Sequence, residues 1–158
     1  MEIWSVAVAL VGAVTGIAAL VTQIWTHALA GPRLRVTLSN SLPIYPDREG
    51  HWVLGLDASN VGRLPVTITS YGLVFRHEGE WRKIPGFQPA SAQLQGPRGA
   101  HRVQDAENVT WLLEPVPFAR TLAEHGAHDA YGYVSLATGR MIRSRKAINV
   151  VHLASIDV

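Results

Sequence analysis

The chain has 158 residues, with 14 lysines and arginines against 12 aspartates and glutamates, a formal net charge of +2 and no cysteine. Without cysteine there is no disulfide framework, no thiolate metal site and no cysteine nucleophile. The basic residues neither form a long run nor alternate with aromatic residues, so no nucleic-acid partner is expected. The length allows one domain beyond an apolar N-terminal segment.

The N-terminal segment is long and apolar. Between Ile3 and Thr26, 24 residues carry no charged side chain, which exceeds the roughly 18 that mark a membrane span. Trp4 and Trp25 stand 21 residues apart, or about 32 Å along a helix, close to the roughly 30 Å of a hydrocarbon core. We therefore predict one transmembrane helix within residues 1–31, followed by a single domain of residues 32–158.

A cleaved secretory signal is the alternative, because Ala28-Leu29-Ala30 fits a small-x-small peptidase site. Two features favour an uncleaved anchor instead. Met1-Glu2 contains no lysine or arginine, and the apolar run is longer than the usual stretch of about 7 to 15 residues in a signal peptide.

Charges beside the span predict its orientation. Arg33, Arg35 and Arg48 follow the helix, whereas its N-terminal side carries only the amino terminus and Glu2. The positive-inside rule therefore favours a cytoplasmic domain at the cell membrane. The other orientation would make the chain an extracytoplasmic domain that binds ligands of the cell envelope.

One face of the predicted helix carries small and weakly polar residues at alternating steps of four and three. The face comprises Ser5, Ala9, Gly12, Gly16, Ala19, Gln23 and Thr26. Small residues allow two membrane helices to approach closely, and Gly12 and Gly16 form a G-x-x-x-G pair. We predict Ala9, Gly12, Gly16, Ala19 and Gln23 as helix-packing residues that associate with a second copy or with another membrane protein. The alternative is an ordinary alanine-rich span.

Gly31-Pro32 ends the helix, and short segments of alternating polarity follow. Strands are expected over 33–39, 52–58, 66–68, 73–75, 81–84, 109–113, 131–137, 141–143 and 148–153, and loops over 40–50 and 85–99. Phe118 to His125 is the one helical stretch expected, with Gly126 as its C-cap. This pattern predicts a mainly β fold, an antiparallel immunoglobulin-like β-sandwich with one short helix.

Several short patterns also match a known group of proteins. Gln23-Ile24-Trp25 precedes Gly31 to Asn40, and Asn60 to Gly72, Val109 to Leu113 and Ala137 to Arg140 follow. In this order the chain resembles uncharacterised small single-span membrane proteins of actinobacteria. The resemblance covers most of the chain and implies the same architecture, a span followed by a β-sandwich, without implying an activity.

The domain contains few side chains arranged for metal binding or catalysis. His125 and His128, with Glu124 and Asp129, form the densest group of metal-capable side chains, but Gly126 ends the helix between the two histidines and the other histidines are scattered. The chain contains no G-x-S-x-G, H-E-x-x-H, Walker A or G-x-G-x-x-G motif. We expect no metal, no cofactor and no catalytic residue.

Basic residues gather near the C-terminus as Arg140, Arg143, Arg145 and Lys146. Such a patch could contact anionic lipid, or it could protect a sheet edge from aggregation. The aromatic residues are expected as core and rim residues of the sandwich, with a surface that binds peptide or sugar as the alternative. They are Trp52, Trp81, Trp111, Tyr71 and Tyr131. The expected function is therefore a membrane-anchored, non-enzymatic interaction or adaptor module.

Overall fold

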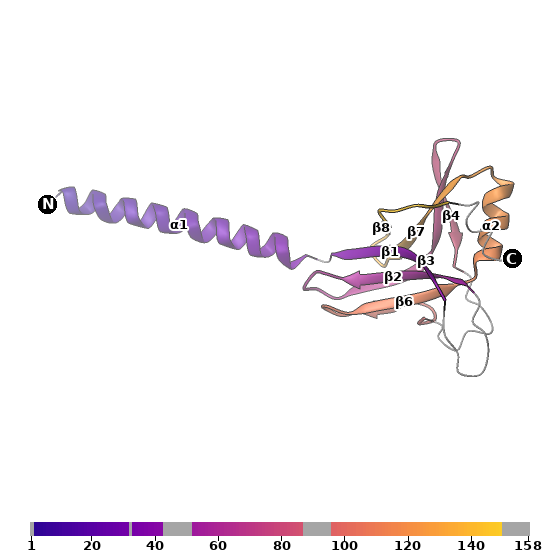
Figure 1. Ribbon diagram of the computed structural model, residues 1–158. Helices are drawn as coiled ribbons and strands as arrows, with labels where there is room; N and C mark the ends of the chain where they lie inside the picture. The colour runs from indigo at the N-terminus through magenta and orange to yellow at the C-terminus, as the bar shows by residue number, and fades with distance from the viewer. Residues whose placement is uncertain (1, 32, 43–51, 87–95, 150–158) are drawn as a thin grey trace.

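The computed structural model describes residues 2–31, 33–42, 52–86 and 96–149 (Figure 1). An N-terminal helix, α1 (Glu2–Ala30), extends away from a domain that contains two antiparallel sheets and a short helix. Most of the two loops expected over 40–50 and 85–99, and the residues beyond Asn149 of the last expected strand, lie outside the described residues.

Helix α1 contains one segment, Trp4–Thr26, that is long and apolar enough to cross a membrane, with a mean hydropathy of 2.2. None of this candidate span is buried against the domain. Its threonines are satisfied locally: the hydroxyls of Thr15 and Thr22 each donate to a carbonyl four residues earlier at 2.8 Å. These two hydroxyls are thereby paired within the helix, as an apolar environment would require.

The smaller sheet has the order β1-β2-β6, formed by β1 (Leu34–Ser41), β2 (Val53–Asn60) and β6 (Asn108–Leu113). In its central strand Leu56 pairs with Leu38 on one side and with Trp111 on the other. Both neighbours of β2 are antiparallel to it, so its backbone groups are paired along both edges.

The larger sheet has the order β4-β3-β7-β8, with β5 beside the start of β3 and β9 beside the start of β7. Its strands are β3 (Val66–His77), β4 (Glu80–Pro85), β5 (His101–Val103), β7 (Asp129–Leu136), β8 (Met141–Arg143) and β9 (Ile148–Asn149). The β3–β4 hairpin turns at Glu78 and Gly79, both with positive φ (51° and 86°), as the tight turns of two-residue hairpins require.

The core lies between the sheets. Leu54, Leu56 and Trp111 of the smaller sheet and Leu73 and Phe75 of the larger one are each at most 2% exposed. The Tyr71 ring stacks on Trp111, with centroids 4.5 Å apart and planes 19° apart. The indole N–H of Trp111 donates to the Pro97 carbonyl at 3.0 Å, so this buried ring leaves no polar group unpaired.

Helix α2 (Pro115–Glu124) adds Phe118 and Leu122 to the core. The mainly β fold class is confirmed, with an apolar N-terminal helix and one further short helix. Helix α2 begins at Pro115, three residues before the predicted start, because proline is well suited to the first turn of a helix.

Two details of the strand prediction were wrong. The segments 66–68 and 73–75 form one strand, β3, whose register with β7 shifts between Ile68 and Ser70 without ending the strand. The three-residue strand β5 was not predicted, because it is too short to show an alternating pattern.

Candidate functional site

The small-residue face of α1 is open to its surroundings. All residues from Trp4 to Thr26 are exposed, including Ala9, Gly12, Gly16, Ala19 and Gln23. A Cβ atom added at Gly12 or Gly16 would meet nothing within 4 Å. Within the described part of the chain, these glycines are therefore not required by any contact, and a larger side chain fits there in the single copy.

The end of the domain next to α1 is organised by Asn60, whose side chain is buried (1% exposed). Its amide nitrogen donates to the carbonyls of Leu64 at 2.8 Å and Gln104 at 2.9 Å, and its Oδ1 accepts the Gly62 N–H at 3.0 Å. One side chain thus ties the β2–β3 loop to the β5–β6 loop. The Asn60-Val61-Gly62 turn lies at this junction.

The same loop contacts the chain that leaves α1. The N–H groups of Val61 and Gly62 both donate to the Arg33 carbonyl, at 2.8 and 3.2 Å. The β2–β3 loop is therefore fixed by backbone hydrogen bonds to a residue three positions after the end of α1.

The four basic residues near the C-terminus line different parts of the surface. Arg145 and Lys146 border a groove of about 270 Å³ together with Arg35 of β1, above Val36 and Leu38. Arg143 lines a separate hollow, and Arg140 is exposed in the turn between β7 and β8. Strand β8 is the last strand in the order of its sheet, so Arg143 is also a charge on a sheet edge.

The hollow beside Arg143 contains the aromatic–arginine platform, formed by Trp81, Tyr131 and Arg143. The guanidinium carbon lies 4.3 Å from the Trp81 ring centroid and 5.3 Å from that of Tyr131. The two rings meet edge to face with centroids 5.8 Å apart, and Trp81 remains 40% exposed. Arg76, His128 and Asp129 complete a shallow hollow of about 440 Å³.

The sequence predicts Trp81 and Tyr131 as core or rim residues, and both lie at the rim, with Trp81 40% exposed and Tyr131 half-buried. They meet because β4 and β7 flank β3 on opposite sides, where Arg76 of β3 pairs with Trp81 and Val74 with Tyr131. No local sequence pattern predicts the contact between Trp81 and Tyr131. The sequence indicates only that Tyr131 and Tyr133 share one face of β7, because they are two residues apart.

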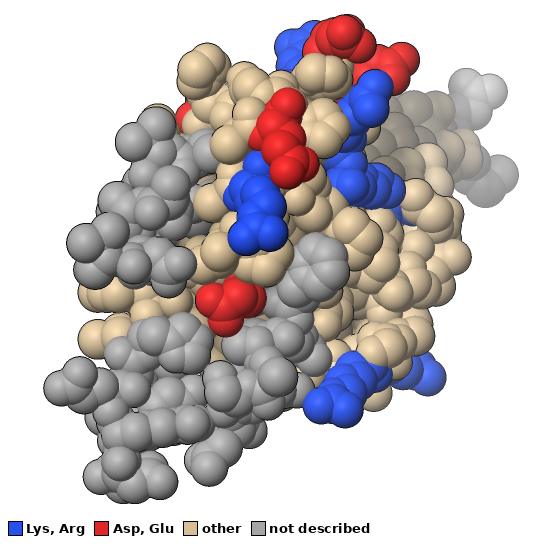
Figure 2. Space-filling view, turned by 90° about the vertical axis from the view of Figure 1, so that its right-hand side faces the viewer, with Lys and Arg blue, Asp and Glu red and all other residues tan. Residues whose placement is uncertain are grey.

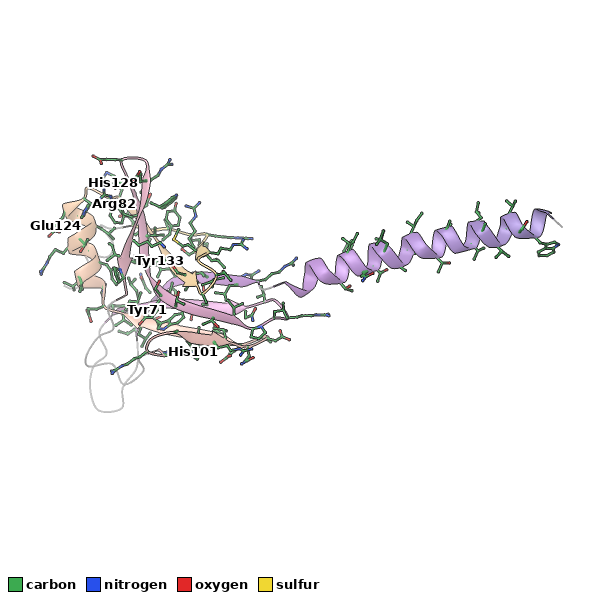
Figure 3. The ribbon with its side chains drawn as sticks, turned by 180° about the vertical axis from the view of Figure 1, so that it is seen from behind. Tyr71, Arg82, His101, Glu124, His128 and Tyr133 are labelled. Atoms are coloured by element: carbon green, nitrogen blue, oxygen red, sulfur yellow. The ribbon has the colours of Figure 1, made fainter. Side chains whose placement is uncertain are left out.

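The histidines among the described residues do not converge on a metal-binding site. The described residues contain no group of three or more metal-capable side chains. His125 Nδ1 faces the Thr121 carbonyl at 2.8 Å, and His77 Nδ1 faces the His125 carbonyl at 3.1 Å. Because carbonyls only accept, both Nδ1 atoms carry the proton. His101 and His128 lie on opposite parts of the domain (Figure 3).

Tyr133 is the buried ionisable side chain of β7, 2% exposed. Burial raises the pKa of Tyr133 above its ordinary value of 10.0, and a hydrogen bond with Ser70 partly opposes this rise. The Lys83 ammonium lies 5.5 Å from the ring centroid. Tyr133 therefore remains neutral at physiological pH and serves as a packing residue beneath Lys83 (Figure 3 shows it in the middle of the sheet).

The end of the domain remote from α1 carries both signs of charge interspersed (Figure 2). Helix α2 contributes Arg120 and Glu124 at exposed positions, and the β3–β4 hairpin contributes Glu78 and Glu80. A surface of this kind creates no strong electrostatic potential of one sign. The groove beside Arg145 and the hollow with the aromatic–arginine platform are therefore the better candidates for binding.

No family model matches the chain, and no curated protein matches it. Among solved structures, the chain is similar to the X-ray structure of Northeast Structural Genomics Consortium target SoR45. The two are 12% identical, and the match covers 75% of this chain and 82% of that chain with a TM-score of 0.24.

Proposed function

We propose that this protein is a membrane-anchored interaction module that performs no catalysis. Its span associates with a second copy or with another membrane protein, and its domain presents a binding surface beside the bilayer. The observation that carries this proposal is the candidate span itself, which has none of its surface buried within the chain although it bears a continuous small-residue face.

The energetics of a bilayer support association through that face. Lipid tails solvate leucine and valine as well as another helix does, so close van der Waals packing of small residues is what favours pairing. Gly12 and Gly16 leave open space around their Cα atoms. Gln23 adds an amide on the same face, which could bond across a helix pair for roughly 0.6 kcal/mol.

The domain supports an interaction role through the aromatic–arginine platform. Tryptophan, tyrosine and arginine are the residue types that carry most of the energy at protein interfaces. In the platform the aromatic rings orient the Arg143 guanidinium, whose N–H groups suit a planar carboxylate. A protein partner with an exposed acidic residue fits this surface best.

We also propose that the two sheets form an immunoglobulin-like sandwich. The orders β1-β2-β6 and β8-β7-β3-β4 correspond to the A-B-E and G-F-C-C′ strand orders of that fold class. Helix α2 then occupies the connection between strands E and F. Domains of this architecture commonly present loops and sheet faces to partners, which agrees with an adaptor role.

For the side of the membrane, Arg33 and Arg35 immediately after α1 support a cytoplasmic domain. A protease added to intact cells then leaves the domain uncut, and cuts it only after the membrane is opened. Digestion in intact cells would instead favour the extracytoplasmic alternative, a domain that binds ligands of the cell envelope.

The association is tested by replacing Gly12 and Gly16 together with isoleucine in the full chain. Both the wild-type chain and the double variant are extracted in mild detergent from the membrane in which they are expressed. The complex of the variant is expected to be smaller, because the bulky side chains keep a partner helix away. Ala7→Ile with Ala18→Ile is the matched control, since both residues lie off the small face. Equal complex size for both double variants would contradict the proposal.

A further inference from the structure

The end of the domain beside α1 exposes two apolar side chains. Val61 is 57% exposed and Leu64 is 50% exposed, in the loop between β2 and β3. Figure 1 shows this connection at the same end of the domain from which α1 leaves. These two side chains supply apolar surface that is favourable to bury if an apolar partner is close by.

The loop cannot move independently of the chain that enters the domain. Val61 and Gly62 donate to the Arg33 carbonyl, and Asn60 holds Leu64 through its buried amide. A Cβ atom at Gly62 would lie 2.5 Å from the Arg33 nitrogen. The position of Val61 and Leu64 is therefore set by backbone contacts with residues directly after α1.

The level of the loop follows from the length of the helix. The candidate span ends at Thr26 and α1 continues to Ala30, which adds about 6 Å of helix beyond the span. The headgroup region on each side of the hydrocarbon core is about 5–8 Å thick. Gly31 follows α1 directly, and a Cβ atom on Gly62 would lie 2.4 Å from its carbonyl oxygen. The β2–β3 loop therefore reaches the level of the headgroups when the span crosses the membrane.

The charges around the loop are mixed. Arg33, Arg35 and Arg63 are exposed there, and Asp105 and Glu107 belong to the β5–β6 loop that Asn60 also contacts. The excess of basic residues is small, so burial of the apolar side chains, and not attraction to anionic lipid, is the main contribution at this surface.

We propose that the β2–β3 loop inserts Val61 and Leu64 into the headgroup–acyl boundary of the membrane that α1 crosses. This contact would hold the domain in one orientation and keep the aromatic–arginine platform in a fixed relation to the bilayer. The inference rests on the proposed anchoring by α1, and it adds a second, separate membrane contact made by the domain.

The chain lacks cysteine, so a single introduced cysteine reports on one position. The full chain is reconstituted in phosphatidylcholine vesicles as four variants, Val61→Cys, Leu64→Cys, Leu42→Cys and Val14→Cys, each with a nitroxide label. Leu42 is the matched control, because it is an apolar residue, 46% exposed, that follows the far end of β1. Oxygen, which partitions into lipid, and a water-soluble nickel chelate then compete to relax each label.

We expect the oxygen-to-nickel accessibility ratio at positions 61 and 64 to exceed that at position 42 several-fold and to stay below that at position 14, which lies near the middle of the candidate span. Ratios at 61 and 64 equal to that at 42, with a lipid-like value at 14, would overturn the loop insertion and leave the anchor intact. A water-like value at 14 would overturn both. Because both loop positions are exposed, either one alone suffices if the other variant does not fold.

Discussion

Gly62 and Arg33 are in direct backbone contact: the Gly62 N–H donates to the Arg33 carbonyl at 3.2 Å, and a Cβ on Gly62 would lie 2.5 Å from the Arg33 nitrogen. The residues that follow α1 and the β2–β3 loop are thus packed against each other. This packing leaves no space for a side chain at position 62.

Replacing Gly62 by alanine is therefore expected to destabilise the domain. The new methyl group meets backbone atoms, which cannot rotate away, and overpacking of this kind costs about 1–3 kcal/mol. Denaturant unfolding of the full chain in detergent, followed by Trp fluorescence, measures the loss. Val61→Ala in the same exposed loop is the control, and its change should stay within about 0.5 kcal/mol. An alanine at 62 with wild-type stability would contradict the close packing.

Asn60→Ala should also destabilise the domain, for a different reason. The alanine leaves the Leu64 and Gln104 carbonyls without the amide that donates to them, and unsatisfied buried groups cost about 1–3 kcal/mol each. Asn60→Asp should be at least as harmful, because a carboxylate facing two carbonyl oxygens repels them. The exposed Asn108→Ala provides the comparison. If Asn60→Asp were as stable as the wild type, the assigned donor role of the amide would be wrong.

The raised pKa of Tyr133 predicts that the folded chain loses stability at alkaline pH. Its folded pKa is raised above 10.0 by burial, so the unfolded chain ionises first as the pH rises. Stability should be fully present below pH 10, and should fall with increasing pH from about pH 10 until the folded pKa is passed. Chemical denaturation between pH 8 and 11 measures this, and Tyr133→Phe should show a shallower decrease. An identical pH dependence in both proteins would contradict a raised pKa of Tyr133 in the folded chain.

The pair formed by Arg143 and Trp81 can be measured by a double-mutant cycle. Stacking at 4.3 Å on a partly exposed ring should give a coupling energy of about 0.5–1 kcal/mol. The variants are Arg143→Ala, Trp81→Ala and both together, each measured by unfolding free energy. Arg140→Ala with Trp81→Ala is the matched cycle and should show additivity. Coupling near zero for Arg143 would mean that the ring does not orient the guanidinium.

Local patterns predicted the apolar N-terminal helix and most strands well, because each depends on residues close in sequence. Leu34, Val36 and Leu38 alternate with polar residues, and β1 buries or half-buries these three. Strand β3 was divided in the prediction because Ser70, Tyr71 and Gly72 resemble a turn. In the fold, Gly72 instead continues the strand, where its missing side chain lets the backbone of Ile84 approach.

Contacts between distant strands could not be predicted in the same way. Trp81 and Tyr131 become neighbours only because β4 and β7 both pair with β3. Similarly, Arg143 and Arg145 are close in sequence but line different hollows, because buried Ser144 lies between them. Its hydroxyl accepts the Gly132 N–H at 3.0 Å and donates to the Lys146 carbonyl at 2.8 Å, which turns the chain there.

The most direct test of the membrane-anchored interaction module is a cysteine scan of α1 in native membranes, from Val8 to Thr22. With no other cysteine in the chain, each variant crosslinks only at its own position, to a second copy or to a partner's thiol. We expect oxidative crosslinking to reach maxima at Ala9, Gly12, Gly16 and Ala19 and minima at Val14 and Val21, which lie on the opposite side of the helix. Absent crosslinking, or equal crosslinking at every position, would contradict association through the small-residue face.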